Sequence, residues 1–216
     1  MNNVTIGSGK PGEGRLFLVR HGETEWSRTG QHTGVTDLSL TEAGERRATA
    51  VGRVLASAFG DTRIDVVLTS PRQRARRTAE LAGFGAEATV DDNVAEWDYG
   101  AYEGLTSEQI MEQTGASWNI WTDGVPAGAT PGEQPADVHA RAEAVIGRLA
   151  NVLDGGGRAI VFSHSHFLRA LTATWLQLPI SGGGLFSLDT GSISTLGFEH
   201  RRRAVKSWNY VPEQYS

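Results

Sequence analysis

The feature that most constrains the fold is a set of short apolar runs separated by stretches with helical periodicity. Three of these runs, at residues 16–19, 64–68 and 159–162, are apolar almost throughout. Strands with one face in water alternate apolar and polar residues, whereas strands covered on both faces do not. The runs therefore predict an α/β fold with a mainly parallel central sheet and helices on both of its faces.

Helix signals fill the segments between these runs. Three patterns predict where helices begin. Two are capping boxes, Ser39-x-x-Glu42 and Thr106-x-x-Gln109, and the third is Ser70-Pro71, with serine as N-cap. Two further helices are expected at 138–153 and 167–178, and the Gly/Pro-rich residues 123–135 predict a loop. Residues 185–198 and 203–209 have strand patterns and can pair as a hairpin.

Composition limits the domain count and the class of partner. The 216 residues fit one domain, preceded by a Gly-rich segment, residues 1–14, that we expect to be a disordered tail. A net charge of −5 provides no general attraction to nucleic acid or to an anionic membrane. The apolar runs are too short to span a bilayer, and no signal-peptide pattern is visible, so a cytoplasmic location is expected. Cysteine is absent, which excludes disulfides and a cysteine nucleophile.

Arginine and histidine side chains closely follow the three predicted strands. Arg20 and His21 come directly after the first strand, Arg74 follows the second, and His164 follows the third. The carboxyl ends of parallel strands meet at one edge of a sheet, where ligands bind in such folds. Several such donors at one edge of an acidic protein indicate a site for a phosphate dianion.

The same residues are suited to phosphoryl transfer. A neutral imidazole such as His21 can attack phosphorus, and nearby cations stabilise the charge that develops on the phosphoryl oxygens. The leaving alkoxide needs a proton, for which Glu96 is the candidate acid, with Asp98 and Glu103 as alternatives close in sequence. A zinc site on His21 and His164 is disfavoured because the arginines would repel a dication, so no metal and no cofactor are expected.

Five segments, in order along the chain, resemble the motifs of a known family. They are residues 18–24 (LVRHGET), 38–44 (LSLTEAG), 69–78 (TSPRQRARRT), 96–104 (EWDYGAYEG) and 163–171 (SHSHFLRAL). By these motifs the chain resembles the histidine phosphatase superfamily, also called phosphoglycerate mutase-like.

The resemblance implies a fold and a set of residue roles. The fold would be a three-layer α/β/α arrangement of the phosphoglycerate mutase type. His21 would be the nucleophile that accepts the phosphoryl group, and Glu96 the proton donor and later the base for water. Arg20, Arg74 and His164 would make the phosphate pocket.

Four more positions are expected at the substrate. Thr33 and Gly34 lie where members of the family contact substrate. Ser27 stands where the family often has asparagine, and Ser165 where it usually has glycine. Both replacements are small and polar, so a phosphate still fits beside them.

The substrate class depends on a small cap, expected at about residues 97–140 within a single domain at 15–216. The cap segment holds seven acids and several aromatic residues but no lysine or arginine. A mutase must bind a second anionic group, which this segment would repel. We therefore expect a metal-independent, acid phosphatase-like phosphomonoesterase, broad in specificity or selective for a neutral or apolar leaving group. The alternatives are a cofactor-dependent phosphoglycerate mutase and a non-catalytic phospho-ligand binding module, against which Glu96 argues.

Several other residues are assigned without a catalytic role. His32, His139 and His200 are expected at the surface, and Trp175 and Trp208 in the core. His166 fits either the pocket or the start of a helix, and the cap aromatics fit either a small core or a substrate wall. A homodimer through the late strands stays open.

Overall fold

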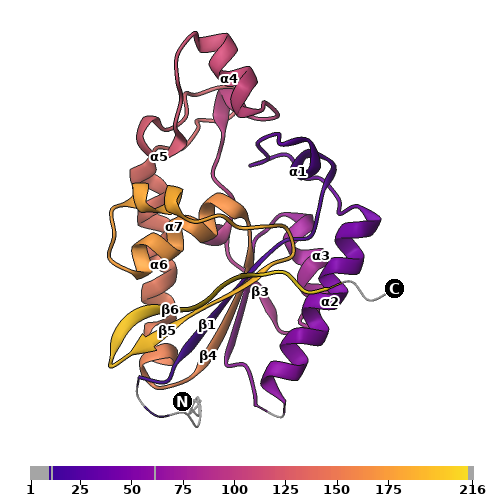
Figure 1. The fold of residues 1–216 in the computed structure, drawn as a ribbon, viewed down its shortest axis with the longest axis vertical. Helices are drawn as coiled ribbons and strands as arrows, with labels where there is room; N and C mark the ends of the chain where they lie inside the picture. The colour runs from indigo at the N-terminus through magenta and orange to yellow at the C-terminus, as the bar shows by residue number, and fades with distance from the viewer. Residues whose placement is uncertain (1–9, 11, 61, 214–216) are drawn as a thin grey trace.

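The computed structural model describes residues 10, 12–60 and 62–213, and within them the chain forms a six-stranded sheet (Figure 1). The strands are β1 (Arg15–Arg20), β2 (Val66–Thr69), β3 (Ala88–Val90), β4 (Arg158–Ser163), β5 (Ile193–Glu199) and β6 (Arg202–Tyr210). Their order is β3-β2-β4-β1-β5-β6, with β1 to β4 parallel and the β5–β6 hairpin antiparallel. The predicted mainly parallel sheet and the predicted hairpin are confirmed.

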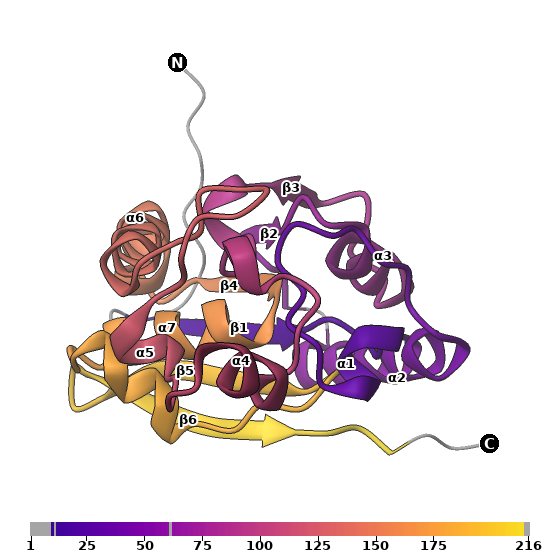
Figure 2. The same ribbon diagram turned by 90° about the horizontal axis from the view of Figure 1, so that it is seen from above.

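Helices cover both faces of this sheet, which confirms the three-layer α/β/α fold (Figures 1 and 2). One face carries α2 (Glu42–Phe59) and α3 (Gln73–Leu81), and the other carries α6 (Pro135–Asp154) and α7 (Ser165–Trp175). Successive strand residues point to opposite faces. Leu18 of β1 accordingly packs in the core cluster that contains Leu149 and Phe167, and Val19 in the cluster that contains Val51 and Phe162.

The short helices α1 (Glu25–Thr29), α4 (Ser107–Thr114) and α5 (Ile120–Asp123) lie beyond one end of the sheet (Figure 1). The described residues also contain the 3₁₀ turns η1 (Asp92–Val94), η2 (Gly100–Tyr102) and η3 (Ile180–Leu185). The loop after α1 is tied to the cap segment, because His32 N donates to Leu105 O and Gln31 Nε2 donates to Gly104 O, each at 2.9 Å. These contacts hold the loop after α1 against the cap segment.

Two of the three predicted helix starts are wrong in detail. The N-cap of α2 is Thr41, whose hydroxyl accepts from Gly44 N, while Ser39 reaches across to Gln73. The N-cap of α3 is Arg72 rather than Ser70. The buried Ser70 hydroxyl accepts from Arg72 N, just ahead of the helix, and from His164. The capping box that begins α4 at Thr106 is confirmed.

The predicted strand at 185–198 begins only at Ile193, because the preceding segment turns back toward β1. Leu185 is exposed in a 3₁₀ turn, Leu188 O accepts from Arg20, and Gly191 has a φ of +64°. The short edge strand β3 was not predicted.

The disordered tail expected at 1–14 falls largely on residues 1–9 and 11, which lie outside the described residues. No helix in the described part of the chain is long and apolar enough to cross a membrane.

Candidate active site

A pocket of about 150 Å³ opens where β1 ends, between the loop after α1 and the start of α7. Six of the predicted site residues line it: Arg20, His21, Ser27, Thr33, Glu96 and Ser165. Residues that the sequence reasoning did not place there also line it, notably His32, Tyr99 and Gln31. The structure therefore brings together residues from four separate segments of the chain, 20–21, 27–33, 96–99 and 165–166.

His21 lies at the end of β1 with only 5 % of its surface exposed. Its Nδ1 is 2.7 Å from Gly22 O, and since a carbonyl oxygen only accepts, Nδ1 carries the proton. Burial, followed by the positive charges of Arg74 and Arg20, holds the pKa of His21 well below its ordinary value. The ring is therefore neutral near pH 7, with an unprotonated Nε2 that has no partner among the described residues.

A close backbone contact holds the loop that carries His21. A Cβ on Gly22 would lie 2.4 Å from Gly44 O, so only glycine lets this loop meet the first turn of α2. Gly22 N also donates to Thr78 Oγ1 of α3 at 3.0 Å. The RHG motif thus places His21 through contacts with two helices.

Arg74 and His164, which were expected to make the phosphate pocket, are fully buried and are not among its lining residues. Arg74 Nε is 3.1 Å from His164 Nδ1, and a guanidinium only donates, so this Nδ1 is an acceptor and Nε2 carries the proton. The Nε2 proton is donated to Ser70 Oγ at 2.7 Å. Burial and the charge of Arg74 hold the pKa of His164 well below its ordinary value. The His164 and His21 rings face each other edge-on, 5.1 Å apart.

Arg74 and Glu103 hold the 33–36 segment from opposite sides. The Arg74 guanidinium donates to the carbonyls of Thr33, Gly34 and Thr36. The Glu103 carboxylate accepts from the N–H groups of Gly34 and Thr36. Burial lowers the Arg74 pKa to about 10, so the charge persists at neutral pH. Thr33 is thereby set at the pocket, and Gly34 lies between the two clamping side chains.

Arg20 supplies a positive charge at the pocket and has an N–H group without a hydrogen-bond partner among the described residues. One terminal nitrogen donates to Leu188 O at 2.5 Å, while Nε is buried and has no hydrogen-bond partner among the described residues. An unpaired buried donor costs free energy, and an anion in the pocket would satisfy it.

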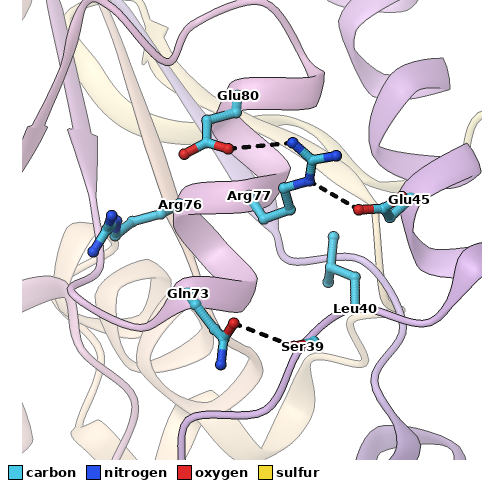
Figure 3. A pocket seen from close by; sticks show the side chains of 7 residues that line it. All are labelled: Ser39, Leu40, Glu45, Gln73, Arg76, Arg77 and Glu80. Atoms are coloured by element: carbon cyan, nitrogen blue, oxygen red, sulfur yellow. Dashed lines mark hydrogen bonds and ion pairs between the residues drawn. The ribbon is translucent and has the colours of Figure 1, made fainter.

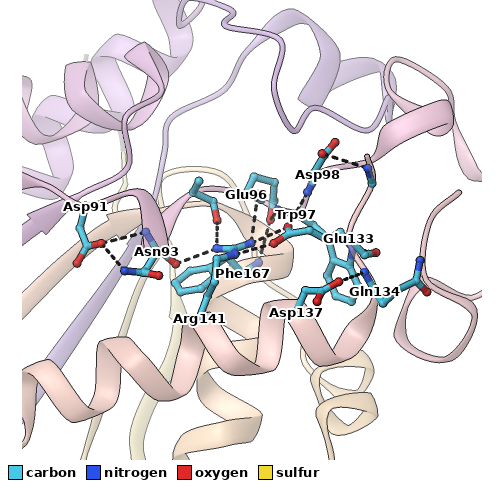
Figure 4. A network of polar contacts seen from close by, with 12 residues as sticks. Asp91, Asn93, Glu96, Trp97, Asp98, Glu133, Gln134, Asp137, Arg141 and Phe167 are labelled. Atoms are coloured by element: carbon cyan, nitrogen blue, oxygen red, sulfur yellow. Dashed lines mark hydrogen bonds and ion pairs between the residues drawn. The ribbon is translucent and has the colours of Figure 1, made fainter. Parts of the chain in front are cut away.

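Glu96 is anchored at the start of α7 by three backbone N–H groups. Oε1 accepts from Trp97 N and Phe167 N, both at 2.9 Å, and Oε2 accepts from His166 N at 3.1 Å. Arg141 holds the same segment by donating to the carbonyls of Asn93, Ala95 and Glu96 while pairing with Glu133 (Figure 4). The acid is therefore fixed in position beside the pocket.

The cap differs from expectation in two respects and decides one question that the sequence left open. Of the two places expected for the cap aromatics, Trp97 and Trp121 take the first, since both are buried in the core cluster. Most of the cap acids are already paired with neighbouring groups, as Glu103 accepts from the amides of Gly34 and Thr36 and Glu133 pairs with Arg141, so they are not a repulsive surface over the pocket. His32, expected at the surface, is half-buried and lines the pocket.

Other residues outside the site have clear places. His166 both starts α7 and lines the pocket. Trp175 is in the core as predicted, whereas Trp208 is only half-buried against it. His139 and His200 both lie away from the pocket; the side chain of His200 is almost fully exposed and that of His139 is partly so.

A second hollow, of about 310 Å³, lies between α2 and α3 (Figure 3). Arg77 lines it but pairs with both Glu45 and Glu80, which neutralises the charge there. None of the predicted site residues lines this hollow. Within the described residues, no group of three or more His, Cys, Asp or Glu side chains is arranged to hold a metal ion.

The buried histidines predict a loss of stability in mild acid. His21, His164 and His166 all have pKa values well below the ordinary 6.5 because burial disfavours their charged forms. Below pH 6.5 the unfolded chain binds protons that the folded chain does not, so stability falls as the pH falls. We therefore expect the free energy of unfolding to be lower at pH 5.5 than at pH 7.5. Urea unfolding at the two pH values measures this, and an unchanged free energy of unfolding would contradict it.

Comparison with known proteins finds relatives that match most of the chain. The model of the histidine phosphatase superfamily (branch 1) matches residues 16–211. The chain is 43% identical to an acid phosphatase of Mycobacterium tuberculosis over 88% of its own length and 90% of the relative's. It is 37% identical to a sedoheptulose 1,7-bisphosphatase of Saccharomyces cerevisiae over 77% and 69% of the two lengths. A solved structure of an open reading frame product from Mycobacterium tuberculosis superimposes with a TM-score of 0.84 at 39% identity, covering 92% of this chain and 98% of that one.

The family match spans most of the chain, and its relatives include phosphatases. The predicted resemblance is thereby confirmed, and the protein is an enzyme of the phosphatase class. The chain belongs to branch 1 of the histidine phosphatase superfamily.

Proposed function

We propose that the protein is a metal-independent phosphomonoesterase that forms a phosphohistidine on His21. The observation that carries this proposal is the state of the His21 ring. Its Nδ1 proton is held by Gly22 O, which leaves Nε2 as a neutral nucleophile in a pocket that also holds Arg20 and Glu96.

In the first step, Arg20 binds the phosphate dianion of the substrate and stabilises the charge on its oxygens. His21 Nε2 attacks phosphorus as the bond from phosphorus to the ester oxygen breaks. The electron pair of that bond goes to the ester oxygen, which takes a proton from Glu96 and leaves as the alcohol. Arg74 and His164 support His21 from behind and hold the 33–36 segment in place.

In the second step, water replaces the departed alcohol. The Glu96 carboxylate takes a proton from the water, and the oxygen of that water attacks phosphorus. The phosphorus–nitrogen bond breaks, its electron pair returns to His21 Nε2, and inorganic phosphate leaves. Glu96 is then protonated again, as it was at the start.

The substrate is a small phosphate monoester, and specificity is broad. A relative named as an acid phosphatase supports this assignment. A mutase must hold a second anionic group, yet among the described lining residues of the pocket Arg20 is the one arginine or lysine, which favours hydrolysis. The cytoplasmic location, the absence of nucleic-acid or membrane partners and the homodimer stay predictions from the sequence.

Trapping of the intermediate tests this function. The enzyme is mixed with an aryl phosphate labelled with ³²P and quenched in alkali, in which phosphohistidine survives, and the labelled peptide is mapped. We expect label on His21 and turnover that EDTA does not change. Label on another residue would refute the mechanism, and activity lost in EDTA would indicate a metal enzyme.

The Glu96→Gln variant tests the role of the acid. We expect turnover of an alkyl phosphate to fall by about 10²–10⁴-fold, because the alkoxide leaves without a proton. p-Nitrophenol is a good leaving group, so p-nitrophenyl phosphate should still show a rapid burst of about one nitrophenol per enzyme, followed by slow hydrolysis. Stopped-flow absorbance measures the burst, and equal loss of burst and steady-state rate would exclude Glu96 as the proton donor.

A further inference from the structure

The wall of the pocket beyond His21 is built from polar rings. The imidazoles of His32 and His166 and the phenol of Tyr99 line it, while the cap tryptophans Trp97 and Trp121 are buried in the core. A third, Trp118, is partly buried and meets the His32 ring edge-on at 5.3 Å. The two imidazoles stack nearly parallel, with 13° between their planes and 6.0 Å between their centres. A leaving group that extends from the phosphate meets nitrogen atoms here rather than an apolar surface.

His32 presents a hydrogen-bond acceptor. Its Nδ1 is 2.7 Å from Leu105 O, and since the carbonyl only accepts, Nδ1 carries the proton. Burial lowers the pKa of His32, so the ring is neutral and Nε2 has a free lone pair. This Nε2 has no partner among the described residues, which leaves it for a ligand.

His166 presents a hydrogen-bond donor beside it. Tyr99 Oη is 2.6 Å from His166 Nδ1, and burial raises the pKa of Tyr99, so the phenol keeps its proton. No other acceptor for that proton is found among the described residues, so Tyr99 donates to Nδ1. Burial holds the pKa of His166 well below its ordinary value, which makes the ring neutral with its proton on Nε2.

We propose that His32 and His166 form a subsite for a leaving group with neighbouring hydroxyls, in which His32 Nε2 accepts from one hydroxyl and His166 Nε2–H donates to the next. This inference rests on the proposed phosphatase function and assigns its substrate class, polyol or sugar monophosphates. Of the neutral or apolar leaving groups expected from the sequence, it selects the neutral, hydroxylated kind, because Trp97 and Trp121 lie in the core and polar rings line the pocket.

A matched pair of substrates tests the subsite. Glycerol 1-phosphate and n-propyl phosphate share the phosphate and the three-carbon chain and differ only in two hydroxyls. We expect kcat/KM of the wild-type enzyme to be at least about tenfold higher on glycerol 1-phosphate, since a site built to hydrogen-bond a hydroxyl rejects an analogue that lacks it.

Variants then assign that preference to the two rings. His32→Phe and His166→Phe each keep an aromatic ring and should lower the glycerol-to-propyl ratio by about tenfold, as the loss of a hydrogen bond to substrate predicts. His32→Gln places an amide oxygen near the Nε2 position and should recover part of the ratio. His139→Phe, the same substitution away from the pocket, should leave the ratio as in the wild type.

The outcomes separate this inference from the function on which it rests. Equal rates of the wild-type enzyme on the two substrates, or an unchanged ratio in both histidine variants, would overturn the subsite and leave the phosphatase function standing. Failure of the wild-type enzyme to hydrolyse either substrate, together with no label on His21, would overturn both.

Discussion

Replacement of His21 by alanine is expected to lower kcat on any phosphate monoester by at least about 10⁴-fold, as the loss of a covalent nucleophile does in other enzymes. The other imidazoles that line the pocket, those of His32 and His166, are assigned in our proposal to the hydroxyls of the leaving group and not to phosphorus. Glu96 and Arg20 would remain, and they can assist only a slow direct attack by water. Steady-state release of inorganic phosphate, with the sensitivity of a labelled substrate, measures the effect.

A matched control separates loss of the nucleophile from loss of the fold. His139→Ala removes the same ring from α6, where it contacts Thr174 and not the pocket, and should keep the wild-type rate. Circular dichroism should show both variants folded at the assay temperature. A His21→Ala enzyme that is folded and retains a kcat within tenfold of the wild type would exclude the phosphohistidine mechanism.

Replacement of Arg74 by leucine is expected to destabilise the protein by about 3–5 kcal/mol and to abolish most activity. The guanidinium has no exposed surface and donates to three carbonyls and to His164. Leucine would leave these buried acceptors unpaired, and the 33–36 segment would lose one side of its clamp. Urea unfolding measures the free energy, and phosphate release at a temperature where the variant is folded measures the activity.

The same variant should also change the pH dependence of the remaining activity. The charge of Arg74 helps to hold the pKa of His21 and that of His164 low, so both should rise toward 6.5 without it. The acid limb of the kcat/KM profile should therefore move to higher pH. Arg76→Leu, an exposed position on the same helix, should change neither the stability nor the profile. A stable Arg74→Leu enzyme with a wild-type profile would contradict both effects.

Much of the fold was readable from local patterns. The runs at β1, β2 and β4 are apolar because both faces of these strands are covered. Consecutive apolar residues are enough to predict such a strand. Helix boundaries were less readable because a serine can bond to more than one partner. Ser70 has the sequence of an N-cap, yet its hydroxyl bonds to His164, which lies 94 residues away in the chain.

Arg20, His21, Arg74 and His164 were predicted from the segments that follow the strands, since parallel strands deliver those segments to one edge of the sheet. Ser27, Thr33 and Gly34 were expected from the family resemblance alone. His32 and Tyr99 were missed because neither directly follows a strand and the resemblance gave neither a role. His32 reaches the pocket only through its backbone and ring bonds to Leu105. Tyr99 stands within a motif segment, but its sequence position does not indicate that its phenol bonds to His166.

The sequence by itself determined the class of fold, the edge of the sheet that carries the chemistry and the residue types available there, because each depends on neighbours along the chain. Only the tertiary structure decided which nitrogen of each imidazole carries the proton, which acids are already bound by amides or arginine, and which aromatic rings meet a ligand. The physical reason is that protonation, desolvation and hydrogen-bond partners are set by groups brought close in space, such as Arg74 beside His164 and Leu105 beside His32.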